Sequence, residues 1–153
     1  MPILRMQSFK TRPGIVERQV MNARRPYLSQ EMIEDVAIRF EPALGLINWA
    51  RSSFINDDAD LLNEDHAHLR TAHIGALWTN APNGRHGLKI VGQAEMGLPP
   101  AGKWPRARIE LQLQQCFGDV PDFVLTFDAE YASTCSDAEF CALVEHELYH
   151  SGQ

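Results

Sequence analysis

The amino-acid sequence predicts an α+β fold, in which a small β-sheet packs with helices. Three observations lead to this prediction: apolar residues at helical spacing, capping residues before them, and short apolar runs typical of strands. At 153 residues, with 44% apolar and 22% charged residues, the chain suits one globular domain with its own core. We find no internal repeat and no linker that would divide it, so we expect a single domain over residues 29–153.

Residues 1–28 lack a clear period and contain Pro2, Pro13 and Pro26, which predicts an irregular N-terminal arm. The arm is basic, since residues 1–25 hold six Lys or Arg against one acid, Glu17. They carry a charge of +5, and the rest of the chain carries −11 of the formal total of −6. We expect the arm to dock on the acidic remainder. The negative total argues against a nucleic-acid partner, because phosphate contacts need a basic surface.

The three cysteines predict reduced thiols in a cytosol and no disulfide framework. Cys116, Cys135 and Cys141 are an odd number and have no CxxC spacing. We interpret them as buried small apolar residues and not as metal ligands. No apolar run is long enough to span a bilayer, and the N-terminus has no signal-peptide pattern. The sequence therefore predicts a soluble, cytoplasmic protein without a membrane partner.

Helices are predicted for the segment after the arm. Ser29 is a suitable cap for a helix, and Pro42 lies just beyond the expected end of that helix. Its apolar positions follow helical spacing: Met32, Ile33, Val36, Ala37 and Phe40. Residues 43–55 predict a second helix, and the acidic residues 56–70 predict a loop or a short helix.

Strand patterns follow in the middle of the chain. Residues 71–80 and 86–95 predict two strands, and Asn83 with Gly84 supplies turn chemistry between them, so we expect a β-hairpin. Residues 105–117 fit both periods, but a proline at the start and Gly118 just past the end favour a helix. The segment DFVLTF, residues 122–127, predicts a compact strand.

The last segment predicts a helix that carries the motif HELYH. Ser136 and Glu139 have the spacing of a capping box, so a helix is expected to begin there and run to about His150. On this helix His146 and His150 lie about 40° apart and one turn above each other, the placement that two imidazoles need to share one metal ion. Glu147 falls within the apolar stripe, where a carboxylate is costly unless it is paired or faces a polar cavity.

The chemistry of this pattern is that of an HExxH metallopeptidase. In it the two histidines bind Zn²⁺, and the glutamate takes a proton from the water that the ion activates for attack on a peptide carbonyl. The sequence thus predicts His146 and His150 as metal ligands and Glu147 as the catalytic base.

The chain resembles the putative phage metallopeptidase family, a zincin-like group related to SprT-type proteins and encoded in phages and prophages. The resemblance covers residues 65–153 through four blocks: HAHLRTAHIGALW, KIVGQAEMGLPP, DFVLTFDAEYA and CALVEHELYHSGQ. It implies a zincin-like architecture, with a small mixed β-sheet packed against helices and HExxH on the C-terminal helix. It also implies that the strand DFVLTF forms the edge of a cleft to which an extended peptide pairs.

The chain departs from the family's pattern at the third metal ligand. Catalytic zinc needs three protein ligands, and the motif supplies two. In the family that the chain resembles, the third ligand follows a block like HSGQ, so residues 29–153 are expected to lack that C-terminal part. The last helical turn is expected to hold His150 loosely. Four explanations stay open: a fragment, a natural truncation without activity, a ligand from elsewhere in the fold or from a partner chain, or a protein without metal.

Several residues are candidates for an internal third ligand. They are His66, His68, His73, His86, Asp128 and Glu130. Asp128 is preferred, because it leaves the strand expected at the cleft. For the four histidines, ordinary positions in a polar loop, a strand or a turn are the simpler interpretation.

Two functions are therefore compared. The first is a phage or prophage zinc metallopeptidase-like protein that acts on a peptide or protein substrate and is weak or inactive if the third ligand is missing. The second is a noncatalytic phage protein that binds and inhibits a host factor such as a defence complex, with its acidic surface imitating nucleic acid. Either would work in the cytoplasm of the bacterial host. The unpaired edge of a small sheet leaves a dimer open.

Overall fold

The computed structural model describes residues 28–34, 37–59 and 61–151. The helices and strands within these ranges are α2 (Gln30–Glu34), β1 (Phe40–Pro42), α3 (Leu46–Ala50), the π-helix η2 (Arg51–Ile55), the 3₁₀-helix η3 (Glu64–Leu69), β2 (Ile74–Thr79), β3 (Gly84–Arg85), β4 (Leu88–Lys89), β5 (Gly92–Met96), α4 (Lys103–Phe117), β6 (Phe123–Asp128), α5 (Ala129–Thr134) and α6 (Asp137–His150). The predicted basic arm over residues 1–28 lies outside the described residues except for Leu28, and the predicted domain boundary stays a prediction.

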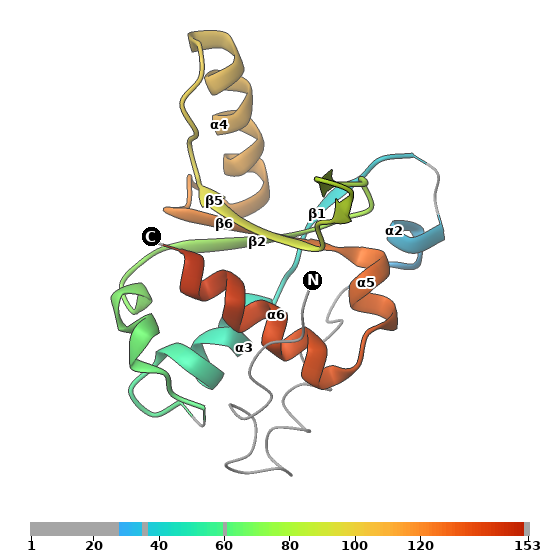
Figure 1. Cartoon of the computed structure of the whole chain (residues 1–153). Coiled ribbons are helices and arrows are strands. Elements are labelled where there is room, and N and C mark those ends of the chain that lie inside the picture. Colours follow the sequence, from blue (N-terminus) through green and yellow to red (C-terminus); the bar gives the residue numbers. More distant parts are fainter. Residues whose placement is uncertain (1–27, 35–36, 60, 152–153) are drawn as a thin grey trace.

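Four strands form one mixed sheet in the order β1-β2-β6-β5. The central pair, β2 and β6, is parallel, and β1 and β5 pair antiparallel with the outer sides of β2 and β6. Figure 1 shows α3 and α6 on one side of this sheet and α4 on the other. The predicted α+β fold with a small mixed sheet and packed helices is confirmed.

The main core lies between the sheet and α6. Alternate residues of a strand point to the same face, so β2 and β6 present Trp78 and Phe127 to α6. These two rings and Phe140 of α6 are fully buried, with ring centroids 5.8–6.2 Å apart. The opposite face of the sheet packs Leu77 and Val124 against α4 in a smaller cluster. The packing of Phe140 against Trp78 and Phe127 positions α6 over its face of the sheet.

Helix α6 begins and packs as the sequence predicts. The Ser136 hydroxyl accepts a hydrogen bond from the Glu139 N–H at 3.1 Å, and the Glu139 carboxylate accepts one from the Ser136 N–H at 2.9 Å. This capping box satisfies two donors at the start of the helix. The predicted apolar stripe is buried: Phe140, Leu143, Val144 and Leu148.

The predicted hairpin between residues 71–80 and 86–95 is wrong in its pairing. Both segments contain strands, β2 and β5, but β6 lies between them and bonds to each. A much shorter hairpin, β3–β4, forms instead around a turn at His86 and Gly87, whose φ angles are 53° and 77°. Two positive φ angles suit a tight hairpin turn, and glycine adopts one of them without strain.

The helix predicted after Ser29 is shorter than its apolar spacing indicates. The Ser29 hydroxyl does accept the Met32 N–H at 3.3 Å, and α2 is described over Gln30–Glu34. Val36 lies outside the described residues, and Ala37 is not helical. Phe40, assigned to the helix by its spacing, instead begins β1 and lies opposite Thr79 of β2. Strand pairing therefore determines the conformation at Phe40, and helical periodicity does not.

The remaining element predictions are largely confirmed. Residues 43–55 contain α3 and η2, and residues 56–70 contain η3. Helix α4 ends at Phe117, followed by Gly118 with φ 84°, although it begins before Pro105. Helix α5 was not predicted.

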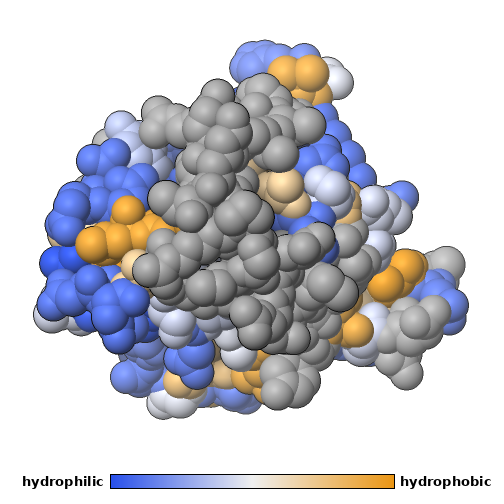
Figure 2. Space-filling view, turned by 90° about the horizontal axis from the view of Figure 1, so that it is seen from below, coloured by the Kyte–Doolittle hydropathy of each residue, from blue (hydrophilic) through white to orange (hydrophobic). Residues whose placement is uncertain are grey.

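The three cysteines are free thiols, and burial raises the pKa of Cys116 and Cys141. None of the described helices is long and apolar enough to cross a membrane. Seen from below, the described surface carries mostly hydrophilic side chains, with apolar ones in small separate patches (Figure 2). Such scattered apolar residues are normal on a protein surface.

Candidate metal centre

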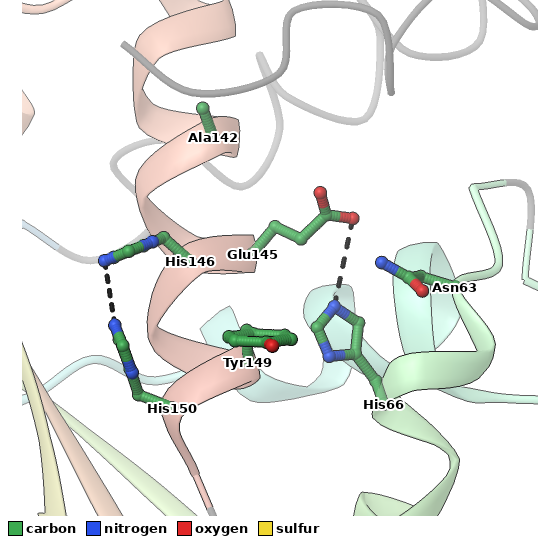
Figure 3. Close-up of a pocket in the computed structure, with 7 residues that line it drawn as sticks. All are labelled: Asn63, His66, Ala142, Glu145, His146, Tyr149 and His150. Carbon is green, nitrogen blue, oxygen red and sulfur yellow. Dashed lines mark hydrogen bonds and ion pairs between the residues drawn. The ribbon is translucent and has the colours of Figure 1, made fainter. Parts of the chain in front are cut away.

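The two histidines of the motif converge on one point. Nε2 of His146 lies 3.0 Å from Nε2 of His150, and the ring centroids are 4.4 Å apart. Figure 3 shows both rings projecting from the same side of α6. Two nitrogens bound to one tetrahedral zinc ion at 2.0–2.1 Å would lie about 3.3 Å apart. The observed spacing is close to that value, so this pair fits a zinc ion.

Glu147 lies beside the pair and is buried against β5. Glu147 is 3% exposed. Any side chain at position 92 would be crowded here, because its Cβ atom would lie 3.0 Å from Oε2 of Glu147 and 2.8 Å from Cδ1 of Leu143. The glycine therefore permits the close approach of α6 to β5. Burial raises the pKa of Glu147 from 4.5 to about 7. A carboxyl group with such a pKa can accept and release a proton near neutral pH.

The histidine pair and Glu147 face a groove of about 770 Å³. The opposite walls are the beginning of β5, at Gly92, and the β3–β4 hairpin, including His86. The implied arrangement, in which DFVLTF is the edge strand at the cleft, is wrong: this segment is the interior strand β6, and β5 is the edge. β5 has one neighbour in the sheet, so its other side can pair with an extended chain.

A second, smaller cavity of about 180 Å³ adjoins the histidine pair on another side of α6. It is lined by Asn63, His66, Ala142, Glu145, His146, Tyr149 and His150. Figure 3 shows Glu145 and Tyr149 projecting toward His66, away from the side that carries the histidine pair. The sequence pattern identified neither Glu145 nor Tyr149 as a site residue. Their position relative to the motif, two residues before and two after Glu147, was the only available signal.

His66 is not the polar loop side chain that its sequence context suggests. It lies in η3, is fully buried, and has no hydrogen-bond partner at either ring nitrogen. Its Nε2 is 3.9 Å from Oε2 of Glu145, which is longer than a hydrogen bond. The structure thus places a buried, unsatisfied imidazole beside a carboxylate.

The end of α6 is anchored, contrary to the expectation of a loose last turn. Ser151 is 1% exposed, and its hydroxyl donates to the Glu147 carbonyl at 3.1 Å. Nε2 of His68 lies 2.6 Å from the Ser151 carbonyl oxygen and must donate, because a carbonyl only accepts. η3 therefore holds the helix end directly after His150.

The other candidate ligands have different partners. The Asp128 carboxylate caps α5 by accepting the Tyr131 N–H at 2.9 Å and lies 3.3 Å from Nζ of Lys89. It lines neither of the cavities that contain the histidine pair. His73 pairs with Asp119 at 2.9 Å. Within the described ranges no three His, Cys, Asp or Glu side chains form a group that could hold a metal ion. Asp128 as third ligand stays a prediction.

The raised pKa of Glu147 predicts a pH-dependent stability of the metal-free protein. Its folded pKa of about 7 exceeds 4.5, so the protonated form stabilises the fold below pH 4.5, and this stability is lost as the pH rises to 7. The free energy of unfolding falls by about 3 kcal/mol over this range, at about 1.4 kcal/mol per unit of pKa shift. The free energy of unfolding of Glu147→Gln, relative to that of the wild type, should therefore rise by about 3 kcal/mol between pH 4.5 and 8. Urea unfolding in the presence of a chelator measures this difference. A difference that does not change with pH would contradict this prediction.

Comparison with known proteins identifies the family. A family model described as putative phage metallopeptidase matches residues 47–153, which include η3, the strands β2–β6 and α6. The match begins earlier in the chain than the resemblance seen in the sequence, which starts at Asp65. Searches of curated proteins and of solved structures returned no match. Since the model covers well over half of the chain, the chain belongs to the putative phage metallopeptidase family.

Proposed function

We propose that this metallopeptidase-like phage protein is a zinc peptidase of zincin-like architecture. His146 and His150 would be two of the ligands of the ion, and Glu147 would act as the base. The observation that carries the proposal is the convergence of the two Nε2 atoms, 3.0 Å apart, in the same groove as a buried glutamate. If the two histidines were a coincidental pair on the surface, nothing would require a carboxylate next to them. At a buried position such a charged group costs free energy.

The chain's own residues divide the chemistry between them. A bound zinc ion would supply the Lewis acidity that activates a water molecule for attack on a peptide carbonyl. Glu147 accepts the proton of the attacking water and passes it to the leaving amine. In the metal-free protein, burial raises the pKa of Glu147 to about 7, which suits a carboxyl group that both accepts and releases a proton. The anchored helix end at Ser151 holds the backbone directly after His150.

The substrate would be an extended peptide bound along β5. The free side of this edge strand offers backbone donors and acceptors that any peptide backbone can pair with, whatever its sequence. Gly92 brings this strand into contact with Glu147, so a peptide paired to β5 would pass the base and the histidine pair. The groove of about 770 Å³ has room for several residues of such a peptide.

A noncatalytic binding protein is the second candidate. It is favoured by one observation: the residues that the structure describes contain no third ligand grouped with His146 and His150. A protein with two ligands would hold zinc weakly, and the groove could then serve to bind a host protein without cutting it.

Metal content separates the two candidates. Purified protein is expected to carry near one equivalent of zinc by elemental analysis and to hydrolyse an unfolded protein substrate. Chelation should abolish the hydrolysis, and added Zn²⁺ should restore it. A metal-free preparation that also fails to bind added zinc would reject the peptidase and support the noncatalytic protein.

A further inference from the structure

The cavity between α6 and η3 contains the carboxylate of Glu145, which has one weak side-chain partner among the described residues. Glu145 is 8% exposed, and its Oε2 lies 3.9 Å from Nε2 of His66. A carboxylate so poorly hydrated is costly without a donor, and at this distance the imidazole does not provide a hydrogen bond. Within the part of the chain that the structure describes, no positively charged donor lies at hydrogen-bond distance from this carboxylate.

The unsatisfied imidazole of His66 is a second, independent feature that points to a ligand in this cavity. Both ring nitrogens are buried without a hydrogen-bond partner, and such groups in native proteins are normally paired with protein, water or ligand. A neutral imidazole offers one acceptor nitrogen. Together with Glu145, it gives the cavity acceptors at two adjacent positions.

The remaining walls suit a cation on an organic stem. The Tyr149 ring lines the cavity next to Glu145, and its π-face attracts a positively charged group. The cavity volume is about 180 Å³, compared with the roughly 150 Å³ that holds a benzene-sized group. A second metal ion fits less well, since His66 and Glu145 are two ligands and the described part of the chain groups no third one with them.

The position of the cavity connects it to the proposed reaction. His146 and His150 line both this cavity and the groove, so the histidine pair forms the wall between the two spaces. A side chain next to a scissile bond at the pair would have to extend past the two histidines to enter the cavity. A long side chain that ends in a cation with several N–H donors would satisfy the acceptors of His66 and Glu145.

We infer that this cavity, lined by His66, Glu145 and Tyr149, is a specificity site for an arginine or lysine side chain next to the scissile bond. Arginine fits best, because its guanidinium has five N–H donors and no acceptor. Glu145 is its charge partner, the acceptor nitrogen of His66 receives one N–H, and Tyr149 stacks on the cation. The inference rests on the proposed peptidase function for the identity of the ligand as a substrate.

A binding experiment on the full chain tests this site without requiring catalysis. The probes are Nα-acetyl-arginine methylamide and the corresponding citrulline compound, which has nearly the same shape but no charge, titrated by calorimetry or NMR. The arginine probe is expected to bind at least about tenfold more tightly. Glu145→Gln should remove this difference. Glu110→Gln, on α4 across the sheet, is the matched control and should retain it.

Equal affinity of the wild type for the two probes would overturn the inference, whatever the variants do. Unchanged preference in a folded Glu145→Gln protein would overturn it as well. If that variant does not fold, Tyr149→Ala replaces it, because Tyr149 is 43% exposed, and a preference that this variant leaves intact would count against the site. Arginine preference without any peptide hydrolysis would reject the peptidase function and leave a cation site. Hydrolysis without arginine preference would reject the specificity site alone.

Discussion

Replacing Glu147 with glutamine is expected to lower peptide hydrolysis by about 10²–10⁴-fold, the contribution of a general base. Glutamine preserves the size of the side chain, so the close approach to Gly92 is retained. It cannot accept the proton of the attacking water. Glu147 is not one of the proposed ligands, so the zinc content should stay at the wild-type level. The measurement is the rate of cleavage of a fluorogenic peptide, with elemental analysis of the same samples.

The control for this variant is Glu110→Gln, which makes the same chemical change on α4, on the other side of the sheet. It should hydrolyse the peptide at the wild-type rate. Equal rates for Glu147→Gln and the wild type would show that the activity belongs to a contaminating protease. Loss of zinc together with activity would assign Glu147 to metal binding and reject its role as the base.

The parts of the fold that the sequence predicts well depend on local interactions. Helix α6 is the best case, because its capping box joins Ser136 to Glu139 and its apolar stripe repeats within each turn. The pair of histidines follows from the same periodicity, since residues four apart on a helix share a side. Their convergence at 3.0 Å therefore needed only the assignment of the helix.

The strand pairing could not be predicted, because it is set by contacts distant in the sequence. β2 pairs with β6, so Ile74 lies opposite Phe123, and this parallel pair displaces the local hairpin that Asn83 and Gly84 favour. Phe40 is a similar case, where pairing with Thr79 overrides helical spacing. Because helices cover both faces of the sheet, non-local strand pairs bury much apolar surface. The free energy of this burial exceeds the preference of a local turn sequence for a hairpin.

The surroundings of the site were hidden from the sequence for the same reason. His68 holds the carbonyl of Ser151 across 83 positions of the chain, and His66 meets Glu145 across a comparable distance. Both histidines precede a strand in a polar stretch, so their sequence context gives no sign of burial. Nothing local identifies β5 as the edge either, since that depends on which strands flank β6.

His146→Ala is expected to remove zinc from the protein. Loss of a residue that only supports a ligand costs about 10–100-fold in metal affinity, so loss of a ligand itself should cost at least about 100-fold. His150 would then be the remaining ligand of the pair, and zinc content should fall from near one equivalent to a trace after dialysis. The matched control is His73→Ala, which removes an imidazole that pairs with Asp119 and lines neither cavity. Its zinc content should equal that of the wild type. If His146→Ala retained a full equivalent, the metal would lie elsewhere, and the convergence of the two rings would reflect only the hydrogen bond between them.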